Sequence, residues 1–373
     1  MNEGTLPEKY LGVPLISGKV TKAALTPLID KIRTRASGWA GKMLSFQGRV
    51  VLARHVLNSI HVHNMAIYKW PKAVVKECET IIRNFIWSGN PAERKAITVS
   101  WEKSCKPTEE GGLGIRRLKD INLSMLMKQA WILLTEEGDW PEFMRGKYIN
   151  RTGGWSNYKT STVWTGIKWA LNEMAPLHGW NVGNGEAINI WRENWLLQKP
   201  ICDFFQEERK EILKYQARLS ECIQGDRWAF SIEMTQVLHH LGIDISKLPQ
   251  PDSSKEDSRV WMASTTGKFI VVAAHEAIRT KAPQPAWSEF IWSSKVLPRT
   301  QGIVWKLAHG VARTNNQLQK RKTHLASRCC LCRNQEETLD HVLFHCPFAK
   351  RVWKYAQQIF HIQREMESFS DVR

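Results

Sequence analysis

Apolar residues recur every three or four positions in long stretches of the N-terminal part of the sequence, and this spacing predicts amphipathic helices. Four segments carry the pattern most clearly: 21–35, 45–60, 73–87 and 121–135. In the first three, basic residues lie between the apolar ones, so we expect helices with basic outer faces. The fourth segment is strongly apolar, which predicts a helix that packs in the core.

Glycine and proline mark the main loop of this part of the chain. Residues 106–116, KPTEEGGLGIR, contain three glycines and a proline and therefore cannot form the interior of a helix. We expect a loop that positions the helix after it. The glycines match neither a dinucleotide-binding GxGxxG sequence nor a Walker sequence, so the loop does not predict nucleotide binding.

The middle of the chain is rich in tryptophan and in short alternating stretches. In residues 180–195, WNVGNGEAINIWRENW, the GNG sequence between two alternating stretches predicts a local β-hairpin. Residues 202–248 have helical, amphipathic spacing, and the polar residues 248–259, with two prolines, predict a linker. The alternating segments around Trp261 and Phe269 predict a further hairpin that packs on the C-terminal part of the chain.

Basic residues exceed acidic ones, with Lys+Arg 53 against Asp+Glu 36 and a formal net charge of +17. Residues 31–76 contain nine Lys or Arg and residues 295–328 contain eight, and neither block contains an acid. Such blocks favour a polyanionic partner, since each neutralised phosphate releases counterions. A basic surface that serves solubility explains the charge about as well. Interleaved aromatic residues such as Trp39 and Trp70 shift the balance slightly toward nucleic acid.

The N-terminus does not join a basic start to an apolar run, and no stretch approaches about 18 consecutive apolar residues. We therefore expect an intracellular protein, in the nucleus or the cytoplasm, without a membrane partner. Thiols stay reduced there, so clustered cysteines indicate a metal rather than disulfides. Four of the eight cysteines are scattered, and the other four lie within residues 329–346.

This segment, CCLCRNQEETLDHVLFHC, carries the strongest chemical signal in the chain. Zinc prefers thiolate and imidazole ligands at four tetrahedral corners, and a Cys-x2-Cys pair supplies two of them from one turn. Cys329 and Cys332 have this spacing, whereas Cys330 falls outside it. Four protein ligands leave no open position for water, so we expect a structural Zn2+ ion rather than a catalytic one.

Spacing leaves the second pair of ligands open. His341 with His345 places two imidazoles on one face of a helix. His341 with Cys346 is also compatible, because Pro347 favours a helix break at Cys346 that turns its thiolate back to the metal. The firmer binding of zinc by a thiolate favours Cys346 over His345.

Several blocks follow one another along the chain: LPEKYLGVPL, GWAGKMLSFQGRVVLARHVLNSI, VSWEKSCKPTEEGGLGIRRLKDIN, WNVGNGEAINIWRENWL, FIWSSKVLPRTQGIVWKLAHGVARTNNQLQKR and CCLCRNQEETLDHVLFHCPFAKRVW. Together they resemble the C-terminal part of a plant non-LTR (LINE-type) retrotransposon reverse transcriptase, including its zinc-binding domain. The resemblance implies a Cys, Cys, His, Cys site, which maps onto Cys329, Cys332, His341 and Cys346. It also places Glu337 and Thr338 at the family's Glu-Thr/Ser position before the histidine.

The resemblance also bears on activity. In that family the YLGVPL stretch follows the polymerase palm, whose paired aspartates bind two catalytic magnesium ions. This sequence has no Asp-Asp pair, only ten residues precede Leu11, and the chain ends at Arg373 without room for an RNase H domain. We therefore expect neither active site, and no enzyme activity.

The expected fold class is mainly α with short β-hairpins, in several modules that end in a small zinc-stapled helical domain. Residues 1–150 resemble a thumb-like or connector-like helical region of a reverse transcriptase. Residues 151–250 are expected to form a tryptophan-rich connector with a hairpin and helices, and residues 251–373 the zinc-binding domain.

The predicted function is non-catalytic binding of RNA or DNA, mainly through backbone phosphates and with little sequence specificity. No small-molecule substrate is expected. The predicted contact residues are Arg49, Arg54, Arg313, Lys320, Arg321, Lys322 and Arg328. Two alternatives stay open: a zinc-stabilised protein-interaction module anchored by exposed tryptophans, and a decayed fragment without a selected function.

Overall fold

The structure is a computed structural model that describes residues 8–39, 43–94, 99–150, 154–156, 158–205, 207–312, 314–320 and 322–368. The chain divides into two compact units, each built from three segments. The first unit comprises Met1–Leu25, His61–Lys72 and Lys119–Arg279, and the second comprises Thr26–Ile60, Ala73–Leu118 and Thr280–Arg373. Both units draw on the predicted module 1–150, and the division into three sequential modules stays a prediction.

The fold class is mainly α, as the sequence predicts, with three short two-stranded antiparallel sheets among the described residues. Strand β1 (Lys9–Tyr10) pairs with β2 (Val13–Pro14), and β4 (Ile223–Gln224) pairs with β5 (Arg227–Trp228). The third sheet joins β3 (His178–Asn181) to β6 (Ser258–Trp261).

The second unit is helical. Its elements are α1 (Lys22–Gly38), α2 (Phe46–His55), a 3-10 turn (Leu57–Ser59), α4 (Lys72–Ser88), α5 (Trp101–Ser104), α12 (Trp287–Ile291), α13 (Pro298–Ala308), α14 (Asn315–Lys320), the π-helix η6 (His341–His345) and α15 (Pro347–Phe360). The three predicted N-terminal helices are confirmed, although the second ends at His55 and continues as the 3-10 turn.

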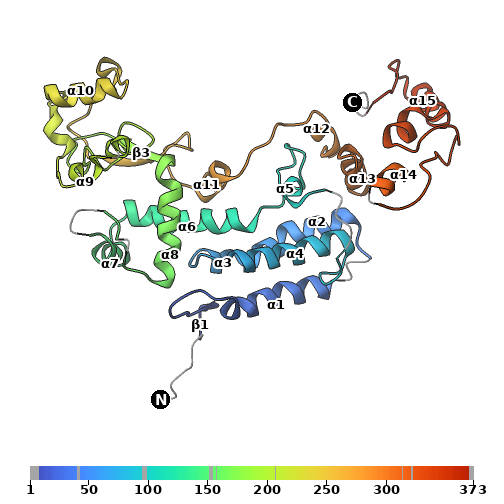
Figure 1. Cartoon of the computed structure of the whole chain (residues 1–373), viewed down its shortest axis with the longest axis horizontal. Helices are drawn as coiled ribbons and strands as arrows, with labels where there is room; N and C mark the ends of the chain where they lie inside the picture. Colours follow the sequence, from blue (N-terminus) through green and yellow to red (C-terminus); the bar gives the residue numbers. More distant parts are fainter. Residues whose placement is uncertain are drawn as a thin grey trace. The chain divides into compact units, whose positions relative to one another are not determined.

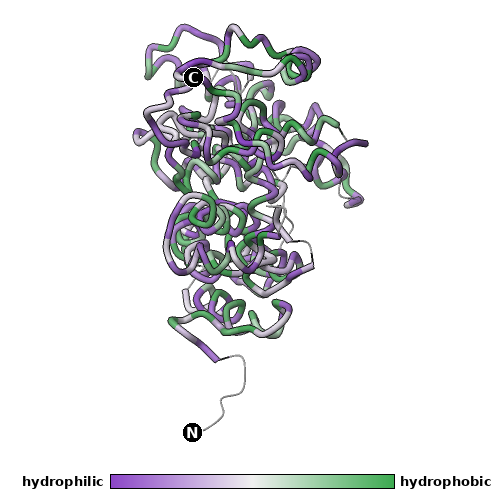
Figure 2. The backbone as a smooth tube through the Cα atoms, turned by 90° about the vertical axis from the view of Figure 1, so that its left-hand side faces the viewer, coloured by the Kyte–Doolittle hydropathy of each residue, from purple (hydrophilic) through white to green (hydrophobic). Residues whose placement is uncertain are grey.

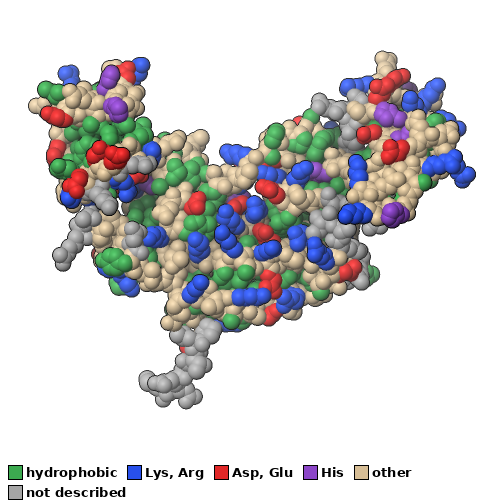
Figure 3. All heavy atoms as spheres, in the orientation of Figure 1, with side chains coloured by type: hydrophobic (Ala, Val, Ile, Leu, Met, Phe, Trp, Pro, Cys, Tyr) green, Lys and Arg blue, Asp and Glu red, His purple; other side chains and the backbone are tan. Residues whose placement is uncertain are grey.

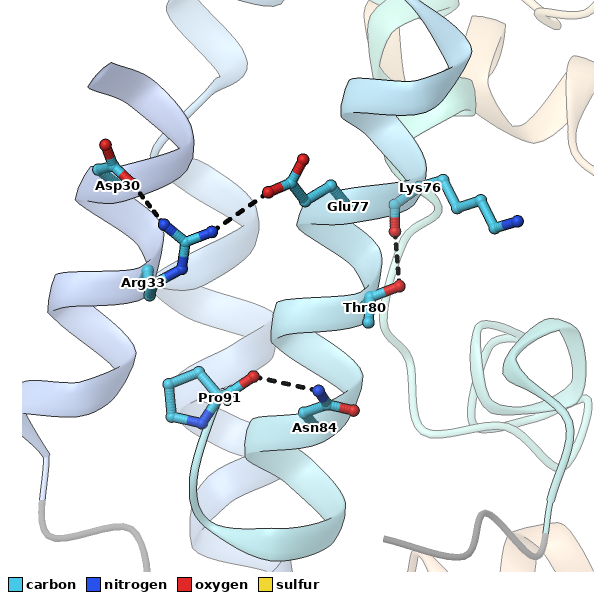
Figure 4. Close-up of polar contacts among 7 residues, drawn as sticks. All are labelled: Asp30, Arg33, Lys76, Glu77, Thr80, Asn84 and Pro91. Carbon is cyan, nitrogen blue, oxygen red and sulfur yellow. Dashed lines mark hydrogen bonds and ion pairs between the residues drawn. The ribbon is translucent and has the colours of Figure 1, made fainter. Parts of the chain in front are cut away.

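Helices α1 and α4 lie side by side (Figure 1) and are joined by an ion pair (Figure 4). The guanidinium of Arg33 on α1 contacts Asp30 on its own helix and reaches Glu77 on α4, with an N···O distance of 3.2 Å. Asn84, near the end of α4, donates to the carbonyl of Pro91 at 3.1 Å. Apolar residues of both helices, such as Ile32 and Phe85, are fully buried.

The glycine-rich loop after α5 anchors helix α13. The carbonyl of Gly111 accepts hydrogen bonds from the indole N–H of Trp305 at 2.8 Å and from the imidazole of His309 at 2.9 Å. Gly112 leaves no room for a side chain, because a Cβ there would lie 1.9 Å from the carbonyl oxygen of Lys106. Trp305 is fully buried against Phe46 of α2, with ring centroids 6.0 Å apart. The predicted loop is confirmed. It holds α13, from the C-terminal part of the chain, against α2, from the N-terminal part.

The first unit has its own helices and, among its described residues, two hydrophobic cores. Its helices are α3 (Val62–Met65), α6 (Leu118–Thr135), α7 (Asp139–Tyr148), α8 (Thr162–Met174), α9 (Arg209–Ile212), α10 (Ile232–His240) and α11 (Val271–Ile278), with 3-10 turns at Ala175–Leu177, Ile201–Phe204, Leu219–Cys222 and Ile245–Lys247. Helices α6, α7 and α8 form the larger core, where Tyr148 stacks on Trp164 with centroids 4.1 Å apart. The prediction that 121–135 packs as core is confirmed.

The predicted hairpin within residues 180–195 is wrong. Strand β3 pairs instead with β6, a segment more than seventy residues further along the chain, in the register His178 to Trp261. The carboxylate of Asp257 explains the difference, since it accepts the backbone N–H groups of Gly183, Gly185 and Ala187 at 2.8, 3.0 and 2.9 Å. The GNG loop therefore wraps around a distant carboxylate and does not return as a strand.

Three related predictions also change. The linker 248–259 ends in strand β6, which lies in a sheet rather than between domains. The described residues of 202–248 contain α9, of four residues, and α10, of nine residues, among 3-10 turns and a hairpin, so the predicted helical segment is largely wrong. The hairpin around Trp261 and Phe269 does not form, because both rings pack on Trp131 of α6.

Figure 2 shows hydrophobic and hydrophilic residues interspersed along the backbone. Among the described residues, no helix has the length and apolar character needed to cross a membrane.

Replacing Asp257 with alanine removes the acceptor of three backbone N–H groups, so the free energy of unfolding should fall by about 2–4 kcal/mol. Urea unfolding followed by tryptophan fluorescence measures this loss. Asp252→Ala is the matched control, because its side chain is 42% exposed and its ion pair with Lys255 lies in solvent. The control should change stability by less than about 1 kcal/mol, and equal losses in both variants would contradict the role of Asp257.

His61 predicts a pH dependence of stability. The side chain is fully buried beside Trp70, and burial lowers the pKa of its imidazole to about 3. In the unfolded chain the pKa of a histidine is about 6.5. Between pH 3 and pH 6.5 the imidazole is therefore protonated in the unfolded state and neutral in the folded state. The stability that neutral His61 contributes is complete above about pH 6.5 and is lost as the pH falls toward 3, by at most about 1.4 kcal/mol per pH unit.

Urea unfolding at pH 7, 6 and 5 tests this dependence. His61→Phe should show a shallower fall in stability than the wild type, whereas His240→Phe, at an exposed position on α10, should keep the wild-type slope. Identical slopes in all three proteins would refute the assignment to His61.

Candidate metal centre and basic surfaces

Four side chains from two segments converge near the end of the chain. The ligand atoms of Cys329, Cys332, His341 and Cys346 all lie within 4.8 Å of one another. The sulfurs of Cys329 and Cys346 are 4.0 Å apart, and the sulfur of Cys332 is 3.3 Å from Nε2 of His341. A tetrahedral zinc ion with ordinary bond lengths separates two sulfurs by about 3.8 Å and a sulfur from a nitrogen by about 3.6 Å. The donor set and its spacing therefore fit zinc.

A tight turn supplies the first two ligands. The carbonyl of Cys329 accepts the N–H of Arg333 at 2.9 Å, and the N–H of Cys329 donates to the carbonyl of Gln335 at 2.8 Å. Arg333 has a left-handed backbone with φ 58°, which a residue with a side chain adopts at a cost. This reversal of the chain directs the backbone N–H groups of Asn334 and Gln335 toward the thiol of Cys332.

Backbone N–H groups prepare one thiol for metal binding. Hydrogen bonding from the N–H of Asn334, opposed by partial burial and helped by His341, lowers the pKa of the Cys332 thiol to about 6. Burial raises the pKa of the Cys329 thiol, and N–H groups of Cys332 and Leu331 partly offset that rise. A metal cation supplies the positive charge that a buried thiolate needs.

The second pair comes from the π-helix and its end. Thr338 accepts the N–H of His341 through its hydroxyl oxygen at 3.1 Å, which fixes the start of η6. Cys346 has an extended backbone (φ −62°, ψ 136°) and precedes Pro347, as expected for a residue before proline. The helix break turns the thiol of Cys346 inward, whereas His345 and Cys330 are exposed.

The two predicted basic residues of α2 differ in exposure. Arg49 is half-buried, and burial lowers the pKa of its guanidinium. Arg54 is exposed, and its guanidinium lies across the glycine-rich loop, 3.0 Å from where a Cβ of Gly114 would be. Arg54 is therefore the better placed of the two to meet a ligand.

The predicted basic residues of the C-terminal segment lie around α14 and the metal centre. Lys320 ends α14, and Lys322 follows with a left-handed backbone (φ 64°), and both are exposed. Arg328 is exposed, but its Nε donates to the carbonyl of Arg333 at 2.6 Å. This hydrogen bond closes the turn of residues 329–333, here called the ligand turn. Arg313 and Arg321 lie outside the described residues.

A further basic cluster joins two lysines of the predicted block 31–76 to Lys119, which lies outside it. The ammonium of Lys69 lies 4.4 Å from the ring centroid of Trp169 on α8. Burial lowers the pKa of Lys69, Glu173 raises it, and the charges of Lys72 and Lys119 lower it again, so both lysines and Glu173 lie near enough to act on Lys69. Lys69 and Lys72 are neighbours in the sequence, before and at the start of α4, and the fold adds Lys119 from the first turn of α6. Figure 3 also shows Lys and Arg outnumbering acidic side chains over α2, α4 and α5 in that view.

The comparison with protein families decides the character of the C-terminal region. Residues 269–353 match the family described as zinc-binding in reverse transcriptase. These residues form a reverse-transcriptase zinc-binding domain. All four converging ligands lie inside it, and the match confirms the resemblance that the motifs predict.

Two proteins of Arabidopsis thaliana are similar to longer or other parts of the chain. One carries the provisional name ribonuclease H protein and is 26% identical over 359 residues, which cover 91% of this chain and 57% of that protein. The other, an uncharacterized mitochondrial protein, is 24% identical over 152 residues, which cover 38% of this chain and 95% of that protein. The chain thus spans little more than half the length of the first relative.

Removing one of the four candidate ligands should strongly weaken metal binding. We expect the purified wild-type protein to bind one zinc ion per chain, and Cys332→Ser to lose at least about 100-fold in affinity, because a serine hydroxyl replaces a thiolate. Competition with a chromophoric chelator measures this affinity. Cys330→Ser is the matched control, since Cys330 lies in the same turn but is exposed outside the cluster. Equal losses in both variants, or a wild-type protein without zinc, would refute the site.

Proposed function

We propose that this chain is a zinc-containing, nucleic-acid-binding relative of the C-terminal part of plant retrotransposon reverse transcriptases. The convergence of three cysteines and one histidine inside the matched zinc-binding domain carries the proposal. Cys329, Cys332, His341 and Cys346 would hold a Zn2+ ion. Four protein ligands fill a tetrahedral shell, so the ion stabilises the module and does not activate water.

The proposed partner is RNA or DNA, contacted mainly at its phosphates. The net charge of +17 and the two acid-free basic blocks support a polyanion. Exposed Arg54, Lys320 and Lys322 are candidate contacts, and the lysine cluster of Lys69, Lys72 and Lys119 is a further one. Phosphate contacts position a protein without reading sequence, so we propose binding with weak sequence preference.

The proposed role is binding rather than catalysis. Asp244 and Asp252, which a metal-dependent nuclease could use, each pair with a nearby lysine and a serine at an exposed position. Asp257 is engaged by three backbone N–H groups of the GNG loop. These aspartates therefore have structural partners.

Helix α15 favours protein interaction as a second candidate function. Large apolar side chains stand half-exposed or more at alternating spacings of four and three residues: Phe348, Val352, Tyr355 and Ile359. Such spacing forms one stripe along a helix and suits contact with another helix. The tryptophans of the middle region support this function less, because Trp164 and Trp195 are buried in the two cores of the first unit.

Salt-dependent binding to a labelled single-stranded RNA tests the main proposal. We expect the logarithm of the association constant to fall linearly with the logarithm of salt concentration, with a slope of about −0.7 per phosphate contact. Lys320→Glu with Lys322→Glu should reduce the slope by about 1.4 and weaken binding at least about tenfold at 0.1 M salt. Fluorescence anisotropy provides the measurement.

Lys268→Glu is the control for a charge reversal elsewhere, because Lys268 is exposed and lies outside the basic blocks. It should weaken binding less than either Lys320→Glu or Lys322→Glu alone, each of which makes the same change in charge. An association constant of the wild-type protein that does not change with salt concentration would refute the nucleic-acid proposal. Protein interaction through the apolar stripe of α15 would then be the better candidate function.

A further inference from the structure

Glu337 lies at the centre of a hydrogen-bond network between the metal centre and helix α14. Its carboxylate accepts the backbone N–H of Asn315 at 3.1 Å and the side-chain amide of Asn315 at 3.3 Å. Its backbone carbonyl accepts the N–H of Asn316 at 3.4 Å. Asn315 and Asn316 are the first two residues of α14, so Glu337 caps the start of this helix from a distant segment.

The same carboxylate also contacts the ligand turn. It accepts the N–H of Cys330 at 3.4 Å, and Cys330 lies between the proposed ligands Cys329 and Cys332. The side-chain amide of Asn315 donates to the carbonyl of Arg328 at 3.3 Å, immediately before the turn. One carboxylate and one amide thus join the start of α14 to the backbone that carries two ligands.

The segment around Glu337 also joins the two ligand pairs. Two residues before it, Gln335 accepts the N–H of Cys329 through its carbonyl, and one residue after it, Thr338 accepts the N–H of His341. Closing the two pairs around a metal fixes both ends of the short stretch 335–338. The position of the Glu337 carboxylate follows from that closure.

Helix α14 needs such a partner because it is short. It has six residues, and a helix of this length is not stable in water without contacts from outside. None of its described residues is buried, and no acidic residue stands in its first turn. The end of α14 fixes the positions of two exposed lysines. Lys320 is its last residue, and the backbone N–H of Lys322 donates to the carbonyl of Gln319 at 2.8 Å.

We infer that Glu337 is a positioning residue through which metal binding fixes helix α14 together with Lys320 and Lys322. The metal holds the ligand turn, the turn and the segment 335–338 hold the carboxylate, and the carboxylate caps α14. This inference rests on the proposed zinc site, and its consequence for nucleic-acid affinity rests on the proposed function. Glu337 itself does not coordinate the metal.

Hydrogen exchange followed by mass spectrometry tests the inference on the full chain, with and without Zn2+. In the wild type, zinc should slow exchange of the amides of Leu318 and Lys322 about 5- to 10-fold or more, the effect of one helix cap on a marginal helix. In Glu337→Ala the zinc-dependent slowing in α14 should fall below about twofold, while chelator competition shows zinc affinity within about threefold of the wild type.

Glu336→Ala is the matched control, because it makes the same truncation at the neighbouring acid. The carboxylate of Glu336 contacts the side chain of Asn316 and no backbone N–H of α14 or of the ligand turn among the contacts described above, so this variant should keep most of the zinc-dependent slowing. Asn315→Ala removes the side-chain amide that donates to Glu337 and to the carbonyl of Arg328, and it leaves Glu337 intact. It should show the same loss of zinc-dependent slowing as Glu337→Ala. It therefore tests the network independently if Glu337→Ala folds poorly. Glu337→Gln keeps an acceptor oxygen and should restore part of the slowing.

Two outcomes would overturn the inference. Wild-type slowing of α14 in zinc-loaded Glu337→Ala and Asn315→Ala would show that α14 is held without the network. A loss of zinc affinity of about 100-fold in Glu337→Ala would show that Glu337 builds the metal site rather than transmitting its closure. Hydrogen exchange needs no nucleic acid, so normal exchange results without RNA binding would refute only the proposed function.

Discussion

Two thiols occupy the place that apolar side chains fill in most small domains. Around the metal centre the described packing consists of Cys329, Cys346 and Ala349, with Cys332 and Val342 against them, and buried Phe344 stacks on Trp353. So few apolar side chains offset only part of the conformational entropy of ordering the segment. The proposed zinc ion would supply the rest, because zinc bound by four protein ligands contributes about 10–16 kcal/mol to the folding of small zinc domains. The ligand turn, the π-helix and the capped α14 would then all depend on this closure.

Sequence predicted what local spacing determines. Helical periodicity located α1, α4 and α6, and the four residues that the sequence analysis favours as a metal site lie together in the structure. Sequence failed where a distant group takes over the backbone. The GNG loop has hairpin composition, but the carboxylate of Asp257 binds three of its N–H groups and directs β3 to β6. The assignment of two compact units from interleaved segments likewise depends on long-range packing that no local pattern encodes.

Charge along the sequence is a poor guide to charge that is free to bind. Arg33 belongs to an acid-free block, yet in the structure it contacts Asp30 and Glu77, which lie just outside that block. Arg328 closes the ligand turn through the carbonyl of Arg333. Lys119 shows the converse, because the sequence places it outside the acid-free blocks and the fold brings its charge near Lys69, which lies over the ring of Trp169.

The lack of room for a side chain at Gly112 restricts how this position can change in evolution. A Cβ at this position would overlap the backbone of Lys106, and the neighbouring Gly111 carbonyl holds Trp305 and His309. Every amino-acid change that one nucleotide substitution can make in a glycine codon adds a Cβ. The codon therefore has no tolerated neighbour except a synonymous one. In copies of this gene that accumulate mutations freely, Gly112 should be lost as fast as any other residue, whereas copies under selection should retain it even where the surrounding surface has diverged.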